Sequence, residues 1–351
     1  MYPRYNRILF GLIAAMLGGA LAVSAWLQPM AGDLVRLGGY SENSFGWRGG
    51  QVAFSPPLAR QGGRGDIVVL GDSFSLRTSP DRQTRYGGFW TDFLAAESGD
   101  TVAVHAFARV SLRRLLRELA PAPPRLVIIE LAERTLLRRL GGKALPCPAA
   151  PAMRTVWPRH RRAVQPHPIA RRWSLFASAD QTADFLWKNL MRDALRHDHT
   201  EVWRLPLARD DLFTSRDAGT LLAYGHDTGK RAWSPADWAG IDCRLRRMQA
   251  LVEAGGRTRF LFMMAPDKSA AYAPYLADPT WRSHSAARLP GVRQVHLDRV
   301  LGAAIAAGVR DVYLPDDTHW GSAGARLAAR AVGKALEGPA DLAAAEAGPA
   351  R

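Results

Sequence analysis

Cysteine and lysine are scarce in this sequence of 351 residues. Two cysteines cannot build a disulfide-dense scaffold or a zinc site with four thiolate ligands. Only five of the 47 basic residues are lysines, and such a bias towards Arg and Ala is typical of a GC-rich coding sequence. The formal net charge of +15 is therefore a weak indication of an acidic partner such as an anionic glycan, a membrane surface or nucleic acid.

Extremes of composition are also absent. Hydrophobic residues make up 47% of the chain and aromatic residues 9%, which excludes a disordered, collagen-like or polytopic membrane protein. The length suffices for one large domain or two small domains with a real core.

One apolar run, Ile8–Leu27, carries no charge. A helix rises about 1.5 Å per residue, so this run spans roughly the 30 Å of a bilayer core. Arg4 and Arg7 precede it, which predicts a cytoplasmic N-terminus and an exported remainder. Val23–Ala25 also fits a signal-peptide cleavage site, but the length of the run and Trp26 at its end favour an uncleaved anchor.

We therefore expect a single-pass protein of the inner membrane with its main domain in the periplasm. Export argues against DNA or RNA as a partner. An oxidising compartment permits Cys147 and Cys243 to pair, and two free buried thiols fit the sequence equally well.

Apolar runs and helical patterns alternate along the chain, which predicts an α/β fold with an open parallel sheet and helices on both faces. We expect strands at 66–70, 101–106, 125–131, 258–264 and 310–314, and helices near 87–98, 110–119, 236–254, 295–307 and 322–337. The predicted organisation is an anchor or signal peptide at 1–30, a lead-in with turns and a hairpin at 31–61, a domain at 62–338 with a long insertion or cap at about 135–235, and a disordered tail at 339–351.

Two polar segments follow predicted strands. Gly71-Asp72-Ser73 comes directly after the strand 66–70, and Asp316-Asp317-Thr318-His319 follows the last predicted strand. In an open parallel sheet, both segments would arrive at one rim. A serine there needs an imidazole base, and the base needs a carboxylate to orient it. We predict a Ser73–His319–Asp317 triad, with Asp316 as the alternative carboxylate.

The same residues carry a family resemblance. GDSFS early in the chain and D-T-H-W late in it resemble the SGNH hydrolase-like superfamily, with the serine first as in ordinary SGNH hydrolases. Three stretches resemble the alginate O-acetyltransferase branch, the AlgX/AlgJ-like proteins. They are Ile129–Arg134, Ala265–Tyr272, and Asp317–Trp320 with Gly324-Ala325 opening a helix.

The resemblance implies an SGNH-like, flavodoxin-like sheet and a periplasmic O-acetyltransferase that acts on an exopolysaccharide or another envelope glycan through an acyl-serine. It implies a membrane-bound O-acyltransferase as donor partner, and neither a cofactor nor a metal is expected. It also implies oxyanion or acceptor-site roles for residues near the triad: Asp72, Glu130, Arg134, Lys268, Tyr272 and Trp320. Beyond the Ser73 amide, the oxyanion donors are open, with Arg109 and Ser111 as candidates.

Other interpretations stay open. The same triad would serve an SGNH carbohydrate esterase or deacetylase, and a non-catalytic glycan-binding scaffold is a third class. Arginines in the insertion fit an anionic glycan or an ordinary polar surface; they are Arg159, Arg161, Arg162, Arg171 and Arg172. Three tryptophans in the insertion fit sugar stacking or, as we favour, packing of the cap; they are Trp157, Trp173 and Trp187.

Overall fold

The structure is a computed structural model. It describes residues 2–27, 32–77, 88–141, 147, 164–169, 179–195, 200–228, 233–278 and 289–337. The arginines and two of the tryptophans singled out in the insertion, Trp157 and Trp173, lie outside these residues, as does the tail from 338 onwards.

A six-stranded sheet forms the centre of the molecule, and all of its strands are parallel. In spatial order the strands are β10 (Gln294–Val295), β9 (Arg259–Ala265), β5 (Leu126–Ala132), β3 (Ile67–Gly71), β4 (Val102–Ala106) and β2 (Arg60–Gln61). Every residue of β3, β5 and β9 is buried, as expected of strands covered on both faces. Without β2, the strands from β4 to β10 follow the flavodoxin-like order 2-1-3-4-5.

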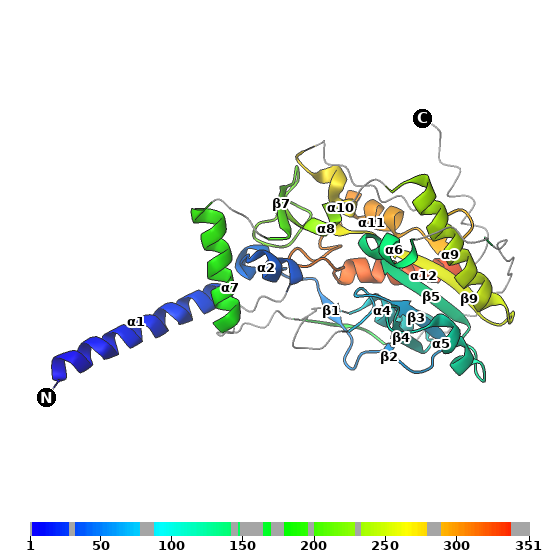
Figure 1. Ribbon diagram of the computed structural model, residues 1–351, viewed down its shortest axis with the longest axis horizontal. Helices are drawn as coiled ribbons and strands as arrows, with labels where there is room; N and C mark the ends of the chain where they lie inside the picture. Colours follow the sequence, from blue (N-terminus) through cyan, green and yellow to red (C-terminus); the bar gives the residue numbers. More distant parts are fainter. Residues whose placement is uncertain are drawn as a thin grey trace.

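Helices cover both faces of the sheet (Figure 1). One face packs against α4 (Trp90–Ser98), α11 (Leu297–Ala306) and α12 (Ser322–Glu337), and the other against α5 (Leu112–Leu119), α6 (Glu133–Leu140) and α9 (Pro235–Glu253). Successive side chains of β3 alternate between these two cores: Ile67 and Val69 point to the first, and Val68 and Leu70 to the second. The expected open α/β sheet is therefore present.

The last expected strand, 310–314, is wrong. Tyr313 forms only an isolated antiparallel bridge to Trp320, and Asp311 has a positive φ of 52°, which breaks an extended conformation. The short strand β10 takes the edge position next to β9 instead. The segment is buried all the same, which explains its strand-like apolar pattern.

The expected hairpin in the lead-in is also wrong. The segment forms two short helices, α2 (Asp33–Gly38) and α3 (Glu42–Phe45), and two short strands that do not pair with each other. β2 joins the edge of the main sheet, and β1 (Val52–Ala53) pairs with β6 (His167–Pro168). The lead-in is thus built into the domain.

A small second core lies beside the main one. It gathers Leu34, Phe45, Phe185 and Leu222 with their neighbours. The elements of the insertion that contribute to it or adjoin it are α7 (Ala179–Asn189), its π-helical extension η1 (Leu190–Ala194), β7 (Val202–Pro206), β8 (Thr220–Tyr224) and α8 (Gly225–Thr228). Two further short helices, α10 (Lys268–Tyr272) and η2 (Ala273–Tyr275), follow β9.

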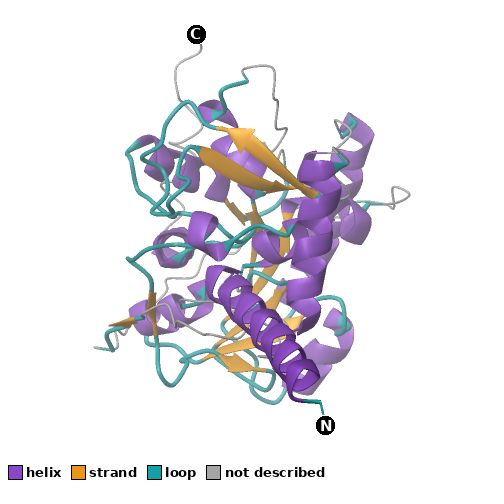
Figure 2. Cartoon of the chain, turned by 90° about the vertical axis from the view of Figure 1, so that its left-hand side faces the viewer, coloured by secondary structure: helices purple, strands orange, loops and turns teal. Residues whose placement is uncertain are grey.

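Helix α1 (Pro3–Leu27) projects from the molecule beside α7 and α2 (Figure 1). Among the described residues, one helix has the length and composition to cross a membrane: Pro3–Val23 of α1, with a mean hydropathy of 1.7 and none of the most apolar window buried. A membrane anchor and a signal sequence both fit this finding. Figure 2 views the molecule from the side on which α1 projects.

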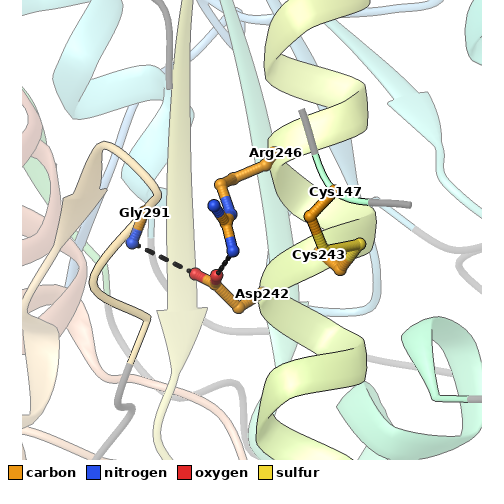
Figure 3. Close-up of a disulfide and its surroundings, with 5 residues drawn as sticks. All are labelled: Cys147, Asp242, Cys243, Arg246 and Gly291. Atoms are coloured by element: carbon orange, nitrogen blue, oxygen red, sulfur yellow. Dashed lines mark hydrogen bonds and ion pairs between the residues drawn. A yellow bond between two sulfur atoms is a disulfide. The ribbon is translucent and has the colours of Figure 1, made fainter. Parts of the chain in front are cut away.

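Cys147 and Cys243 form a disulfide (Figure 3). The bond joins Cys147, which follows α6, to helix α9. On the next turn of α9, Arg246 pairs with Asp242 at 2.8 Å, and Asp242 also accepts a hydrogen bond from the Gly291 amide. The structure thus selects the paired alternative for the two cysteines.

Candidate active site

Ser73 stands at the carboxyl end of β3, in a turn that its neighbour Asp72 holds in place. One oxygen of Asp72 accepts the Phe74 N–H at 3.1 Å, and the other accepts the Ala132 N–H at 2.7 Å. Asp72 therefore fixes the nucleophile turn to the end of β5 and is itself buried. Ser73 remains half-buried, so its hydroxyl faces the rim of the sheet.

His319 reaches Ser73 from the loop between Tyr313 and Trp320. Its Nε2 lies 2.9 Å from Ser73 Oγ, and its Nδ1 lies 2.5 Å from Asp317 Oδ1. The same Asp317 oxygen also accepts the His319 backbone N–H at 2.9 Å. The imidazole is thus oriented with one nitrogen on the carboxylate and the other on the serine hydroxyl, which is the arrangement that base-assisted serine attack requires.

Asp316, the alternative carboxylate, has a different place. Its side chain is fully buried beside Glu42, and burial followed by the Glu42 and Asp317 charges raises its pKa well above the usual range. Its backbone carbonyl accepts the N–H groups of Leu34 and Val35. Asp316 therefore helps to fasten the histidine loop and does not contact the imidazole.

Lys268 holds the same loop from below. Its buried ammonium donates to the carbonyl oxygens of Leu314 at 2.8 Å and Pro315 at 2.9 Å. Burial lowers the pKa of this lysine to about 8, against the opposing effect of Asp316 and Asp317. The Lys268 ammonium is too deeply buried to contact an acceptor sugar. We therefore assign Lys268 to support of the histidine loop and not to the acceptor site implied by the resemblance.

Asp33, the first residue of α2, is a neighbour of the triad that sequence reasoning missed. Its carboxylate accepts the Thr318 N–H at 2.8 Å and the Thr318 hydroxyl at 2.6 Å, and it lies 3.6 Å from His319 Nδ1. Its backbone N–H donates to Asp317 at 3.2 Å. A second carboxylate therefore faces the imidazole from a segment 284 residues away from Asp317 in sequence.

The approach of α2 depends on Gly32. A Cβ atom at this position would lie 2.1 Å from the Asp316 carbonyl oxygen, so only glycine allows the contact. Burial, followed by the charge of Asp317, raises the pKa of Asp33, whereas His319 acts in the opposite direction. The lead-in thus completes one wall of the site.

Glu130 lies behind the nucleophile turn and is fully buried. Its Oε2 accepts the Ser75 hydroxyl at 2.6 Å and the Asp72 N–H at 3.2 Å, while Ser75 Oγ also accepts the indole N–H of Trp90. Burial and then Asp72 raise the pKa of Glu130 well above its usual range. Because this carboxyl has no exposed surface, we assign it to support of the turn, not to the acceptor.

Three aromatic and cationic side chains enclose the triad. The Phe74 ring packs against the His319 ring at 4.7 Å and the Trp320 ring at 4.6 Å. Arg134 lies over Phe74 at 5.9 Å and donates to Asp267 at 2.9 Å. Trp320 is 7% exposed and the Arg134 side chain is 14% exposed, so both form part of the wall of the site.

Tyr272 is removed from the site surface. Its hydroxyl is fully buried, accepts the Tyr313 N–H at 3.4 Å and has its pKa raised by burial. It supports the start of the histidine loop.

Arg109 and Ser111 follow β4, next to β3, and both side chains are exposed. Ser111 begins α5, and the Arg109 N–H donates to Ala106. Within the described part of the chain, no hydrogen bond joins either residue to Ser73 or His319. Among the described residues, the Ser73 N–H donates to no acceptor, so this amide is available to an oxyanion.

Asp33, Asp317 and His319 place three ligand-type atoms within 4.8 Å of one another. Their oxygens already accept hydrogen bonds from Thr318 and from the imidazole. We therefore interpret this cluster as a hydrogen-bonded arrangement around the imidazole.

A comparison with protein families finds a match in the C-terminal part of the chain. Residues 230–349 match the family described as an SGNH hydrolase-like domain, acetyltransferase AlgX. The match includes Lys268, Asp317 and His319, and Ser73 lies before its first residue. No curated protein and no solved structure matches the chain.

Proposed function

We propose, from the premise that the chain is an SGNH-like protein of the AlgX branch, that it is a serine O-acetyltransferase acting on hydroxyl groups of an envelope or exported polysaccharide. The observation that carries the proposal is the continuous chain of short contacts from Asp317 through His319 to Ser73, at 2.5 and 2.9 Å.

In the first half-reaction, His319 Nε2 takes the hydroxyl proton of Ser73 while Ser73 Oγ attacks the carbonyl carbon of the acetyl donor. The negative charge moves to the carbonyl oxygen, where the free Ser73 N–H donates to it. When the donor's bond to the acetyl carbon breaks, the leaving oxygen receives the proton from His319. The product is an acetyl ester on Ser73.

In the second half-reaction, His319 accepts the proton of a sugar hydroxyl as that oxygen attacks the acetyl-serine. Collapse of the second tetrahedral intermediate returns the proton to Ser73 Oγ and leaves the acetyl group on the sugar. Asp317 and Asp33 stabilise the imidazolium that forms in each half-reaction, because both carboxylates face its Nδ1–H side.

Two features support an exported, membrane-anchored enzyme. Helix α1 is long and apolar enough to span a bilayer, and the Cys147–Cys243 disulfide suits an oxidising compartment. The acetyl group must then come from a cytoplasmic donor across the membrane. A membrane-bound O-acyltransferase is the kind of partner that would deliver it.

One assay separates this proposal from its alternatives. The full chain is incubated with an activated acetyl ester, with and without oligosaccharides of neutral and uronic-acid type, and both free acetate and acetylated sugar are measured. If acetylated sugar forms with the wild type and does not form with the Ser73→Ala variant, the transferase is supported. Acetate alone, whichever sugar is present, means that water is the acceptor and the protein is an esterase. Sugar binding without any acetyl release identifies a non-catalytic scaffold and refutes the proposal.

A further inference from the structure

The continuous helix formed by α7 and η1 turns Phe185 and several polar side chains towards the protein, and it leaves several large apolar side chains exposed. Its inner face caps the end of α2. Lys188 donates to the Arg36 carbonyl at 3.2 Å, Asn189 donates to the Gly39 carbonyl at 3.0 Å, and Arg192 donates to the Gly38 carbonyl. Two carbonyls of α2 and the carbonyl of its C-cap Gly39 thereby gain hydrogen-bond donors, and two of these donors are cationic.

The outer face carries large exposed apolar side chains, and the helix also exposes Asp184 and Asp193. Leu186 is 50% exposed, Trp187 58%, Leu190 51% and Leu195 60%. Trp187 therefore does not pack the cap as we expected. A surface helix of a soluble domain normally has the reverse orientation, with the apolar stripe inside. Large side chains gathered on one exposed face indicate a surface that is covered by something else.

The position of α7 relative to α1 limits what can cover this face. Figure 1 shows α7 at the edge of the domain, between α2 and the projecting α1. Val23, at the end of the apolar span, packs against the second core, to which α7 contributes Phe185. The span of 21 residues is about 30 Å long at about 1.5 Å per residue, which matches a bilayer core. Val23 would therefore lie at the outer boundary of the hydrocarbon.

We propose that the outer face of α7–η1 lies in the lipid–water interface of the bilayer that α1 crosses. The proposal rests on the membrane anchoring included in the proposed function. An interfacial helix buries its apolar face about 5–10 Å into the headgroup region, and tryptophan is enriched at that depth. A helix next to the last turns of a membrane span is at that depth already.

Membrane contact at α7 would bear directly on the triad. The inner face of α7 holds the C-terminal end of α2, and the N-terminal end of α2 places Asp33 beside His319. The bilayer surface, α7, α2 and the histidine loop therefore form one connected series. Such an arrangement would keep the site near the surface at which a membrane-bound donor releases its acetyl group.

Photo-crosslinking of the full chain in nanodiscs of phosphatidylethanolamine and phosphatidylglycerol tests the proposal. A photoreactive benzoylphenylalanine replaces Trp187 or Leu190, and in the control it replaces Leu251, a 37% exposed leucine on α9. We expect lipid adducts from positions 187 and 190 and none above background from position 251. Adducts to a second copy or to another protein, without lipid, would overturn the proposal.

Fluorescence quenching by brominated lipids provides a second measurement that is insensitive to the photoreactive group. Quenching should be clearly weaker in the Trp187→Phe variant than in the wild type, and unchanged in the Trp238→Phe variant. The Trp238 ring packs against Trp233 beside the core formed by α5, α6 and α9. Equal quenching in wild type and Trp187→Phe contradicts the proposal. Both experiments are repeated in Ser73→Ala, so that lipid contact is measured whether or not acetyl transfer occurs. Lipid contact without acetyl transfer by the wild type would contradict the proposed function but not the membrane contact of α7.

Discussion

Replacement of Asp33 by asparagine removes one negative charge beside His319 and one acceptor oxygen of the Thr318 contacts. The asparagine oxygen can still accept the Thr318 N–H, so the loop contact is retained. The Asp33 carboxylate lies 3.6 Å from His319 Nδ1. Two unit charges about 4 Å apart interact by about 4 kcal/mol at an effective dielectric constant of about 20.

Only part of that interaction is lost, because Asp317 remains and the site relaxes. We expect Asp33→Asn to reduce kcat/KM for an activated acetyl ester by about 10- to 100-fold, equivalent to about 1.4–2.8 kcal/mol. Stopped assays at a fixed pH near neutrality measure the effect.

Thr318→Val is the matched control. It removes the hydroxyl that Asp33 accepts at 2.6 Å but leaves both carboxylates beside the imidazole, so kcat/KM should stay close to the wild-type value. Circular dichroism and thermal unfolding establish that each variant is folded. A folded Asp33→Asn enzyme with the wild-type kcat/KM, or a Thr318→Val enzyme with the same loss of kcat/KM as Asp33→Asn, would refute the electrostatic role of Asp33.

Three further predictions concern buried groups and the disulfide. Glu130→Gln should make the protein more stable than wild type above neutral pH. Because the pKa of Glu130 is raised in the folded protein, the free energy of unfolding of the wild type falls by up to about 1.4 kcal/mol per pH unit between the ordinary carboxyl pKa and the folded one, whereas glutamine does not titrate. Urea unfolding measures this, and parallel curves of stability against pH for the two proteins would contradict it. Lys268 has a folded pKa of about 8 and an unfolded value of 10.5, so the unfolded chain binds more protons between these values and wild-type stability should rise with pH there, a rise that Lys268→Met should abolish. Cys243→Ser opens a link between residues 96 positions apart and should lower the free energy of unfolding by about 2–5 kcal/mol, and an unchanged unfolding midpoint would show that the disulfide constrains nothing.

The sequence predicts the parts of the structure that have a local pattern. The buried strands β3, β4, β5 and β9 and their helices appear within a few residues of their expected positions, because each long apolar run must be buried between helices. The serine and histidine segments are expected at one rim for the same reason, and the structure places Ser73 and His319 2.9 Å apart. Their catalytic roles stay predictions.

The parts that the sequence does not predict depend on contacts between distant residues. β2 and β10 have two residues each, which is too short for any alternation to be visible. Asp33 stands in a lead-in rich in glycine and turns, and its position beside His319 follows from the fit of Gly32 on the Asp316 carbonyl. One signal was available: an acidic residue directly after a glycine at the start of a short helix, close to the end of the anchor. It does not identify the partner.

The acetyl-serine intermediate is the centre of this account, and mass spectrometry of the enzyme quenched during turnover tests it most directly. The full chain is mixed with an activated acetyl ester in the absence of sugar, stopped in acid and digested. We predict an acetyl group on the peptide that contains Ser73, which is absent in Ser73→Ala, fails to form in His319→Ala and disappears from the wild type when an acceptor sugar is added before the quench. An acetyl group on any other residue would contradict the account. So would turnover by a wild-type enzyme whose Ser73 stays unmodified, together with an active Ser73→Ala variant.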